Sequence, residues 1–110
     1  MARSCRHHWR VACASPDYLK RRGTPKSPKD LAGHSCLQFG ALSPTPYWEF
    51  HEAGKPRQVR IRGSFSSSHG APVIEAARRG LGIVLALSYQ LQEAVSAGEL
   101  RVILQAYEPE

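Results

Sequence analysis

Apolar residues in this chain occur in short runs and alternations that are separated by polar turns. The unbroken run Gly82–Leu87 predicts a strand that is covered on both faces. Arg57–Arg62 alternates basic and apolar residues, as a half-buried strand does. Together with the aromatic segment Tyr47–Phe50 it predicts an antiparallel hairpin that turns at Ala53–Pro56. Shorter apolar segments predict three further strands, at Arg10–Ala14, Cys36–Phe39 and Arg101–Leu104.

Helices are predicted where the apolar spacing changes to three and four residues. Ala71–Arg79 has this spacing, and Gly80 follows it with the left-handed conformation that ends many helices. Ser88 is expected to cap a second helix, Tyr89–Ala97. Two further short helices are indicated by the cap-then-proline pairs Ser15-Pro16 and Ser27-Pro28. Strands that alternate with helices, plus one hairpin, predict a mixed-sheet α/β sandwich.

The polar turn Ser66–Gly70 lies between the hairpin and the first of these helices. A turn of this kind places free backbone N–H groups at a helix N-terminus, where the helix dipole favours anions. We interpret Ser67, Ser68 and His69 as candidates for holding the carboxylate, or a similar group, of a small ligand. The commoner alternative is that Ser68 or His69 simply caps the helix, since every helix needs a cap.

Composition limits the class of protein. The chain has 110 residues and 42% hydrophobic residues, which predicts one globular domain with a modest core. It contains neither an apolar run near the roughly 20 residues of a membrane span nor a signal-type apolar segment. The net charge of +6 suits acidic partners or nucleic acid. The basic residues are spread along the sequence without interleaved aromatics, however, so we interpret most of them as solvated surface.

The three cysteines are odd in number and follow no pattern, which fits a reducing cytoplasm better than a secreted disulfide framework. Cys13 and Cys36 fall in predicted strands and are expected to be buried. Cys5 lies near His7 and His8, but no second ligand pair stands at structural-zinc spacing. We therefore predict no metal and no other cofactor.

A hydrolase is the enzymatic alternative. Ser66–Ser68 and His69, with Asp17 or Glu75 as a third partner, supply the residue types of a catalytic triad. The sequence has no G-x-S-x-G nucleophile elbow, and an adjacent serine and histidine on one turn rarely face each other. We therefore predict that the chain is not an enzyme.

An ordered set of short motifs resembles the effector-binding domain of LysR-type transcriptional regulators. The matching segments are Val11–Leu19, Gly23–Pro25, Asp30-Leu31, His34–Leu37, Trp48–Phe50, Ser68–Gly70, Glu75–Ala77, Gly80–Ile83, Leu91, Gly98–Leu100 and Tyr107–Pro109. Each motif is weak alone, but the set covers nearly everything from Val11 to Glu110. In this family the domain resembles type II periplasmic binding proteins, in which two α/β lobes clamp a small ligand and the chain crosses the hinge twice.

The resemblance implies a three-layer α/β sandwich that corresponds to the second lobe alone. Residues 1–10 would form a leader and hinge, residues 11–104 the lobe, and residues 105–110 the exit hinge. The winged helix-turn-helix and nearly all of the first lobe have no counterpart here, so DNA contact is expected only through a domain that this chain lacks.

The function implied by the resemblance is that of a ligand-sensing lobe in a cytoplasmic bacterial regulator. It would bind a small anionic effector, for example a carboxylate, would assemble as a homo-oligomer and would have no membrane partner. Two alternatives stay open. One is a solute-binding protein, against which the missing signal peptide and first lobe count. The other is a basic nucleic-acid-binding fragment, which salt-dependent DNA binding would reveal.

The resemblance also assigns three elements to the ligand cleft. The nine residues concerned are Gln38, Phe39 and Gly40 at the end of one strand, Ser67, Ser68, His69 and Gly70 in the polar turn, and Leu87 and Ser88 at the end of the buried strand. Many relatives carry a proline where Leu87 stands, and an acidic or amide residue where His69 stands. A histidine there favours an anionic effector when it is charged.

Overall fold

The computed structural model describes residues 10–108. In chain order the elements are β1 (Arg10–Ala14), α1 (Pro16–Arg22), the 3₁₀ helix η2 (Pro28–Gly33), β2 (Cys36–Phe39), β3 (Tyr47–Glu52), β4 (Lys55–Arg60), β5 (Gly63–Ser67), α2 (Gly70–Arg78), β6 (Ile83–Leu87), α3 (Ser88–Ser96), β7 (Arg101–Ile103) and the 3₁₀ helix η3 (Gln105–Tyr107). The predicted strands β1 and β2 have the bounds expected from the sequence.

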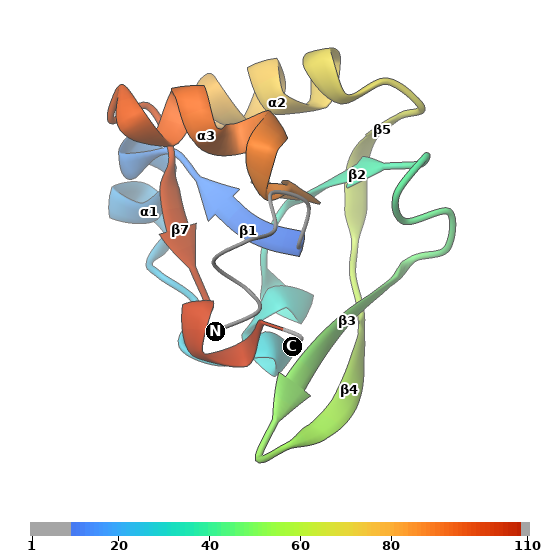
Figure 1. Cartoon of the computed structure of the whole chain (residues 1–110). Helices are drawn as coiled ribbons and strands as arrows, with labels where there is room; N and C mark the ends of the chain where they lie inside the picture. The colour runs from blue at the N-terminus through green and yellow to red at the C-terminus, as the bar shows by residue number, and fades with distance from the viewer. Residues whose placement is uncertain (1–9, 109–110) are drawn as a thin grey trace.

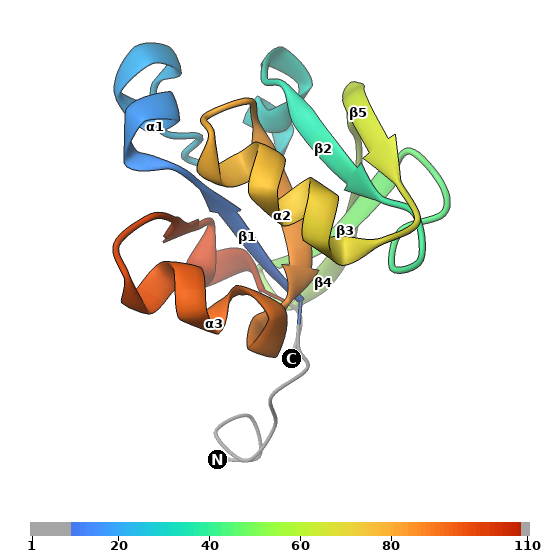
Figure 2. The same ribbon diagram turned by 90° about the horizontal axis from the view of Figure 1, so that it is seen from above.

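A five-stranded mixed sheet organises the fold, with the strand order β5-β2-β6-β1-β7 (Figures 1 and 2). β2 runs parallel to β5 and β6, whereas β1 runs antiparallel to β6 and β7. The ends of β2, β5 and β6 therefore lie at the edge where β1 begins, with Arg10 opposite Leu87 and Phe39 opposite Ser67. We call this the carboxyl edge. The basic end of α1 lies beyond the opposite edge, because α1 follows the end of β1.

Side chains alternate across the sheet and so divide the core into two halves. Val11, Cys13, Val84 and others face α2 and α3, which lie side by side over one face of the sheet (Figure 2). Ala12, Leu85 and others face a layer formed by α1, η2 and the β3–β4 hairpin. The strand β6 contributes to both halves, as its unbroken apolar run predicts, and the result is a three-layer sandwich.

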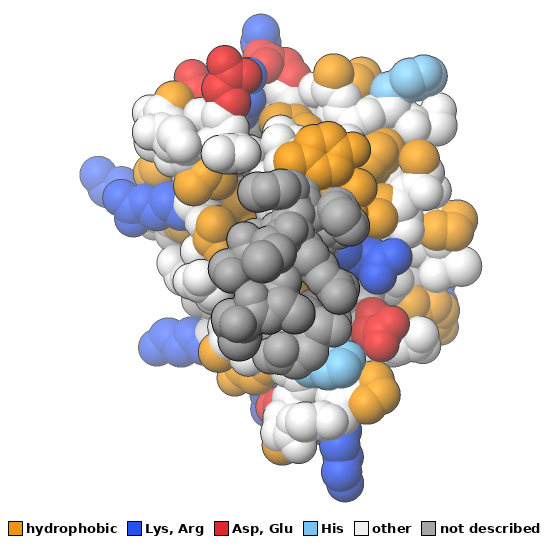
Figure 3. Space-filling view, viewed as in Figure 1, with side chains coloured by type: hydrophobic (Ala, Val, Ile, Leu, Met, Phe, Trp, Pro, Cys, Tyr) orange, Lys and Arg blue, Asp and Glu red, His pale blue; other side chains and the backbone are white. Residues whose placement is uncertain are grey.

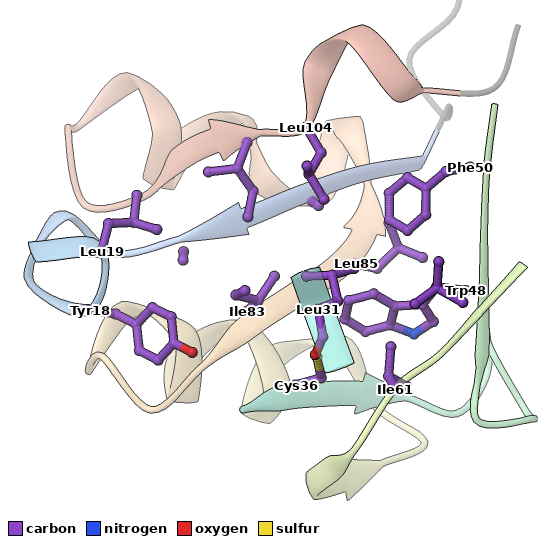
Figure 4. Close-up of a cluster of buried hydrophobic side chains, with 14 residues drawn as sticks. Tyr18, Leu19, Leu31, Cys36, Trp48, Phe50, Ile61, Ile83, Leu85 and Leu104 are labelled. Atoms are coloured by element: carbon purple, nitrogen blue, oxygen red, sulfur yellow. The ribbon is translucent and has the colours of Figure 1, made fainter. Parts of the chain in front are cut away.

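The second half of the core is built on aromatic side chains. Trp48 and Phe50 project from the hairpin toward the sheet, on the same side as Tyr18 and Leu31 (Figure 4). Trp48, Tyr18 and Leu31 are each no more than 1% exposed. Full burial of a large apolar side chain contributes roughly 1.5–3 kcal/mol relative to exposure, so these contacts fix the hairpin to the sheet.

Two local predictions were wrong. The hairpin turns at Ala53 and Gly54 alone, which both have positive φ values, so β4 starts at Lys55. Such two-residue turns match the twist of paired strands. In addition, Gly63–Ser67 forms a strand at the edge of the sheet, which the sequence did not predict, and Phe65 within it is 40% exposed.

Candidate functional site

The carboxyl edge joins the ends of strands that are far apart in sequence. Phe39 ends β2 and is 8% exposed. The N–H of Gly40 donates a hydrogen bond to the carbonyl oxygen of Ser67 at 2.8 Å. This bond ties the loop after β2 to the end of β5, immediately before the turn that was predicted to bind a ligand.

Within the turn Ser67–Gly70 at this edge, Ser68 and His69 are exposed, whereas Ser67 and Gly70 are half-buried. The hydroxyl of Ser67 accepts a hydrogen bond from the N–H of His69 at 3.1 Å. Ser68 Oγ and His69 Nδ1 lie 3.4 Å apart, and both side chains are exposed. His69 occupies the N-cap position of α2, but within residues 10–108 no side chain caps this helix. His69 therefore stands at the cap position, but neither its imidazole nor the Ser68 hydroxyl caps the helix with a hydrogen bond.

The end of β6 leads directly into α3. The helix begins at Ser88, one residue earlier than predicted, and Leu87 is its N-cap residue. Ser88 Oγ is buried and has no hydrogen-bond partner among the described residues, so the predicted Ser88 cap is wrong. Gln90, at the third helical position, instead bonds to the N-cap residue, because its Oε1 accepts a hydrogen bond from the N–H of Leu87 at 3.1 Å.

Gln90 also brings the two helix starts together. A Cβ atom at Gly70 would lie 3.0 Å from Gln90 Nε2 and 3.5 Å from Phe39 Cζ. Such a distance is tighter than ordinary side-chain contacts, so a larger residue at position 70 would push Gln90 aside. Gly70 therefore allows α2, α3 and β2 to meet closely at the carboxyl edge.

Gln38 lies at this end of β2 but its side chain is engaged elsewhere. Its Nε2 donates hydrogen bonds to the carbonyl oxygens of Ser43 at 2.8 Å and Thr45 at 3.0 Å. Alternation along β2 places Gln38 on the face opposite Leu37 and Phe39. The amide nitrogen therefore holds the loop between β2 and β3.

A groove of about 620 Å³ opens between α2 and α3 and starts at Gly70. Its charged lining is Glu75 and Arg78 of α2. Arg79 Nε donates to Glu75 at 2.9 Å and, as the main cause, lowers the pKa of that carboxyl group. Arg78 pairs with Glu99 at 2.8 Å, which joins α2 to the turn before β7. The charges of this groove are thus satisfied within the fold.

Comparison with known proteins identifies the family. The model of the LysR substrate binding domain matches residues 2–110. The chain belongs to this family. It is 34% identical over 98 residues to the probable HTH-type transcriptional regulator LtrA of Klebsiella pneumoniae, which covers 89% of the chain and 32% of LtrA. It is also 34% identical over 92 residues to the HTH-type regulator CrgA of Neisseria meningitidis, covering 83% and 30%.

Solved structures of LysR-type regulators have the same fold. The full-length virulence activator AphB of Vibrio cholerae superposes with a TM-score of 0.83 at 27% identity, over 94% of this chain and 35% of AphB. The regulatory domain of CrgA superposes with a TM-score of 0.80 at 30% identity, over 94% and 50%. The present LysR domain thus has the periplasmic-binding-protein-like fold and spans about a third of the length of its curated relatives.

The fold of this LysR domain brings most of the sequence-predicted site residues to one edge. Gln38 also lies at this edge, but its side-chain amide nitrogen donates its hydrogen bonds to the loop between β2 and β3. The sequence analysis did not assign two further residues that lie at this edge. Arg10 pairs with Leu87 across β1 and β6, and Gln90 accepts a hydrogen bond from the N–H of Leu87. A polar residue three positions after a strand end is a capping signal, and it could have pointed to Gln90.

Other sequence predictions concern cofactors, thiols and membranes. Cys13 and Cys36 are fully buried, and burial raises the pKa of each thiol to about 12. Within residues 10–108 no cluster of three or more His, Cys, Asp and Glu side chains could hold a metal ion. Cys5, His7 and His8 lie outside the described residues. None of the described helices combines the length and the apolarity needed to cross a bilayer.

Ser68 and His69 of the hydrolase alternative lie within 3.4 Å of each other, but neither proposed third partner, Asp17 or Glu75, hydrogen-bonds to His69. Asp17 pairs with Arg21 at 3.3 Å on α1, beyond the opposite edge of the sheet. Glu75 pairs with Arg79 and faces the groove between the helices. Within the described part of the chain, no carboxylate forms a hydrogen bond with His69 that would orient its ring as a triad requires.

Proposed function

We propose that this LysR domain is a ligand-sensing lobe of a cytoplasmic bacterial transcriptional regulator, and that it is not an enzyme. A small anionic effector, such as a carboxylate, would bind at the carboxyl edge. The main support is the convergence of the ends of β2, β5 and β6 near the turn Ser67–Gly70, in which Ser68 and His69 are exposed. In open α/β sheets, ligands bind outside the carboxyl ends of the strands.

The chemistry of this turn favours an anion. The hydroxyl of Ser68 and the imidazole of His69 are exposed donors. The first N–H groups of α2, at Gly70 and Ala71, are not capped by any described side chain. They would add donors aligned with the helix dipole. Arg10, at the start of β1, brings a positive charge to the same edge.

An apolar residue at this edge would contact the rest of the effector. Leu87, half-buried at the end of β6, is placed to do so, whereas Phe39 at the end of β2 is 8% exposed and packs in the core beneath α2. In a two-lobed domain the effector contacts both lobes, and its binding favours the closed arrangement. It shifts the equilibrium only if it binds one arrangement more tightly than the other. In the full regulator this change would alter the packing of a homo-oligomer and so the contact that a separate DNA-binding domain makes with its operator.

The proposal is tested by calorimetric titration of the chain with acetate, succinate and benzoate. Ser68→Ala and His69→Ala each remove one side-chain donor, and a hydrogen bond to a charged group contributes about 1.5–3 kcal/mol. We therefore expect each substitution to weaken carboxylate binding by about tenfold or more. Ser96→Ala, at the far end of α3, is the matched control and should bind as the parent does.

Two outcomes would contradict the proposal. In the first, none of the three carboxylates binds to the chain or raises its Tm. In the second, Ser68→Ala and His69→Ala bind carboxylates as tightly as Ser96→Ala. Sedimentation of the chain at high micromolar concentration tests the homo-oligomer separately, and a monomer under these conditions would contradict self-association by this lobe.

A further inference from the structure

Basic side chains gather beyond the sheet edge that is opposite the carboxyl edge. We define this basic surface as Lys20 and Arg22 at the end of α1, Lys26 and Lys29 in the following segment, and Arg62 before β5. All five side chains are exposed. In Figure 2, α1 and the starts of β2 and β5 lie on the side of the sheet away from the chain ends, whereas Figure 3 views the molecule from the side where β1 begins.

Two hydrogen bonds to main-chain carbonyl oxygens connect the end of α1 and Arg62 to the segment between η2 and β2. Arg22 Nη2 donates a hydrogen bond to the carbonyl oxygen of Gly33 at 3.0 Å. Three residues later, the N–H of Cys36 donates to the carbonyl oxygen of Arg62 at 3.2 Å. Arg22 and Arg62 therefore border the same short segment, although 40 positions separate them in the sequence.

The charges of the basic surface are not neutralised within the fold. Among residues 10–108, none of its five cations forms an ion pair, whereas the neighbouring Arg21 pairs with Asp17 at 3.3 Å. The Asp30 carboxylate accepts hydrogen bonds from the backbone N–H groups of Lys26 at 3.0 Å and Ser27 at 3.3 Å. Its Oδ2 atom is thereby directed to the main chain, and Asp30 forms no ion pair with Lys26 or Lys29 among the described residues.

We propose that the basic surface docks on the phosphate backbone of duplex DNA. Unpaired, exposed cations attract a polyanion and release its counterions on contact. We choose duplex DNA as the polyanion because the curated relatives are named HTH-type transcriptional regulators. Within the surface, the Tyr18 ring is buried beneath Arg21 and Arg22 and cannot stack on bases. The contact is therefore with phosphates and independent of sequence.

This contact is separate from effector sensing and lies at the other end of the sheet. The sequence was interpreted as carrying scattered surface charge, with DNA contact only through another domain, whereas the fold brings Arg62 beside the segment that follows the other four cations. The contact would hold the sensing lobe against DNA to which another domain has already bound. Either proposal can fail without the other, because the two sites share no residue.

The test measures fluorescence anisotropy of a labelled random-sequence duplex of about 20 base pairs, titrated with the chain at several salt concentrations between about 20 and 200 mM. Four or five phosphate contacts predict a slope of log K against log salt of about −4. The triple variant Lys20→Gln, Lys26→Gln, Lys29→Gln should reduce the magnitude of that slope by about 3. Circular dichroism would show that the variant is folded.

The matched control removes three exposed cations from the hairpin, through Lys55→Gln, Arg57→Gln and Arg60→Gln. It changes the net charge by the same amount and should keep the slope of the parent within about 1. Equal loss of slope in both triple variants would assign binding to overall charge and overturn the proposal. Absence of duplex binding by the parent would do the same, as would binding to anionic phospholipid vesicles without binding to the duplex.

Discussion

At the scale of single residues, a buried tyrosine organises the corner between α1 and η2. The N–H of Ser35 donates to the Tyr18 hydroxyl at 3.2 Å, so the hydroxyl proton is free to donate to His34 Nδ1 at 2.8 Å. This arrangement requires a neutral His34, since a protonated ring would present N–H at that position. Burial, and next the Arg22 guanidinium, lower the pKa of His34, while Asp30 acts in the opposite direction.

His34 should therefore make stability depend on pH. Its pKa is below 6.5 in the folded chain, so the unfolded chain takes up the proton at a higher pH. The free energy of unfolding should fall as the pH drops below about 6.5. His34→Gln should show a shallower fall between pH 6.5 and 5 in urea unfolding. The control His51→Gln should keep the contribution of His34, and identical pH profiles for the parent and His34→Gln would contradict this role.

The buried thiols predict unusually low reactivity. At pH 8 a thiol with a pKa of about 12 is a thiolate in roughly one molecule in 10⁴. In a Cys5→Ser background, Cys13 and Cys36 should not react with a disulfide reagent over the minutes in which a free thiol reacts. Both should react at once in 8 M urea. Rapid reaction in native buffer would show that β1 or β2 is not buried as described.

At the scale of elements, the two helices that follow buried strands begin differently. Ser15 is 3% exposed, and its hydroxyl accepts a hydrogen bond from the N–H of Tyr18 at 3.0 Å. Ser88 stands in a similar sequence position after β6, but its hydroxyl caps nothing among the described residues. The two serines thus form a matched pair for measuring the worth of a cap.

Ser15→Ala should lower the free energy of unfolding by about 1 kcal/mol, because it removes the cap of α1. Ser88→Ala should leave it within about 0.5 kcal/mol of the parent, or raise it, since an unpaired hydroxyl is removed from a buried position. Urea unfolding followed by circular dichroism measures both changes. A larger loss for Ser88→Ala than for Ser15→Ala would contradict the assigned helix starts.

The junction of β2 and β6 depends on a close approach at Gly82. A Cβ atom there would lie 2.7 Å from the carbonyl oxygen of Ser35, which accepts the N–H of Ile83 at 2.9 Å. Gly82→Ala should therefore destabilise the chain by about 1–3 kcal/mol through overpacking. Gly33→Ala is the control, because no described atom lies within 4 Å of its added Cβ, and it should change stability by less than about 0.5 kcal/mol. Equal effects would refute the close approach.

Sequence reasoning succeeded where burial leaves a periodic trace. The strands β1 and β2 were predicted with their observed bounds because their apolar residues reach both halves of the core. Gly63–Ser67 was missed because an edge strand that is largely exposed shows no apolar alternation. The sequence also allowed the polar turn Ser67–Gly70 to be assigned to the candidate site, because the turn directly precedes a predicted helix and a predicted buried strand.

The remaining features of the site depend on tertiary contacts. Gln90 looks like any polar helix residue until α2 and α3 are packed together and its amide lies against Gly70. The orientation of Gln38 depends on the path of the loop between β2 and β3, whose carbonyl groups accept its hydrogen bonds. The basic surface likewise requires Arg62 to be carried next to Cys36 by the pairing of β2 with β5.

At the scale of the whole molecule, the sheet separates two kinds of surface. The carboxyl edge presents the exposed residues Ser68 and His69, two helix starts and the half-buried Leu87, which suits a small anionic ligand. The opposite edge presents the basic surface, which suits an extended polyanion. Both surfaces could attract a small carboxylate. Binding at the carboxyl edge would indicate specific recognition, whereas binding at the basic surface would indicate general attraction between opposite charges.

Chemical-shift mapping of the ¹⁵N-labelled chain during titration with benzoate tests the central claim most directly, with neutral benzamide as the control ligand. We predict that the largest benzoate-specific shifts occur at the backbone amides of Ser68, His69, Gly70 and Ala71, with smaller shifts at Gln90. Benzoate shifts that are largest at Lys20–Lys29, or that benzamide reproduces in full, would contradict the proposal that the carboxyl edge is an anion-selective effector site.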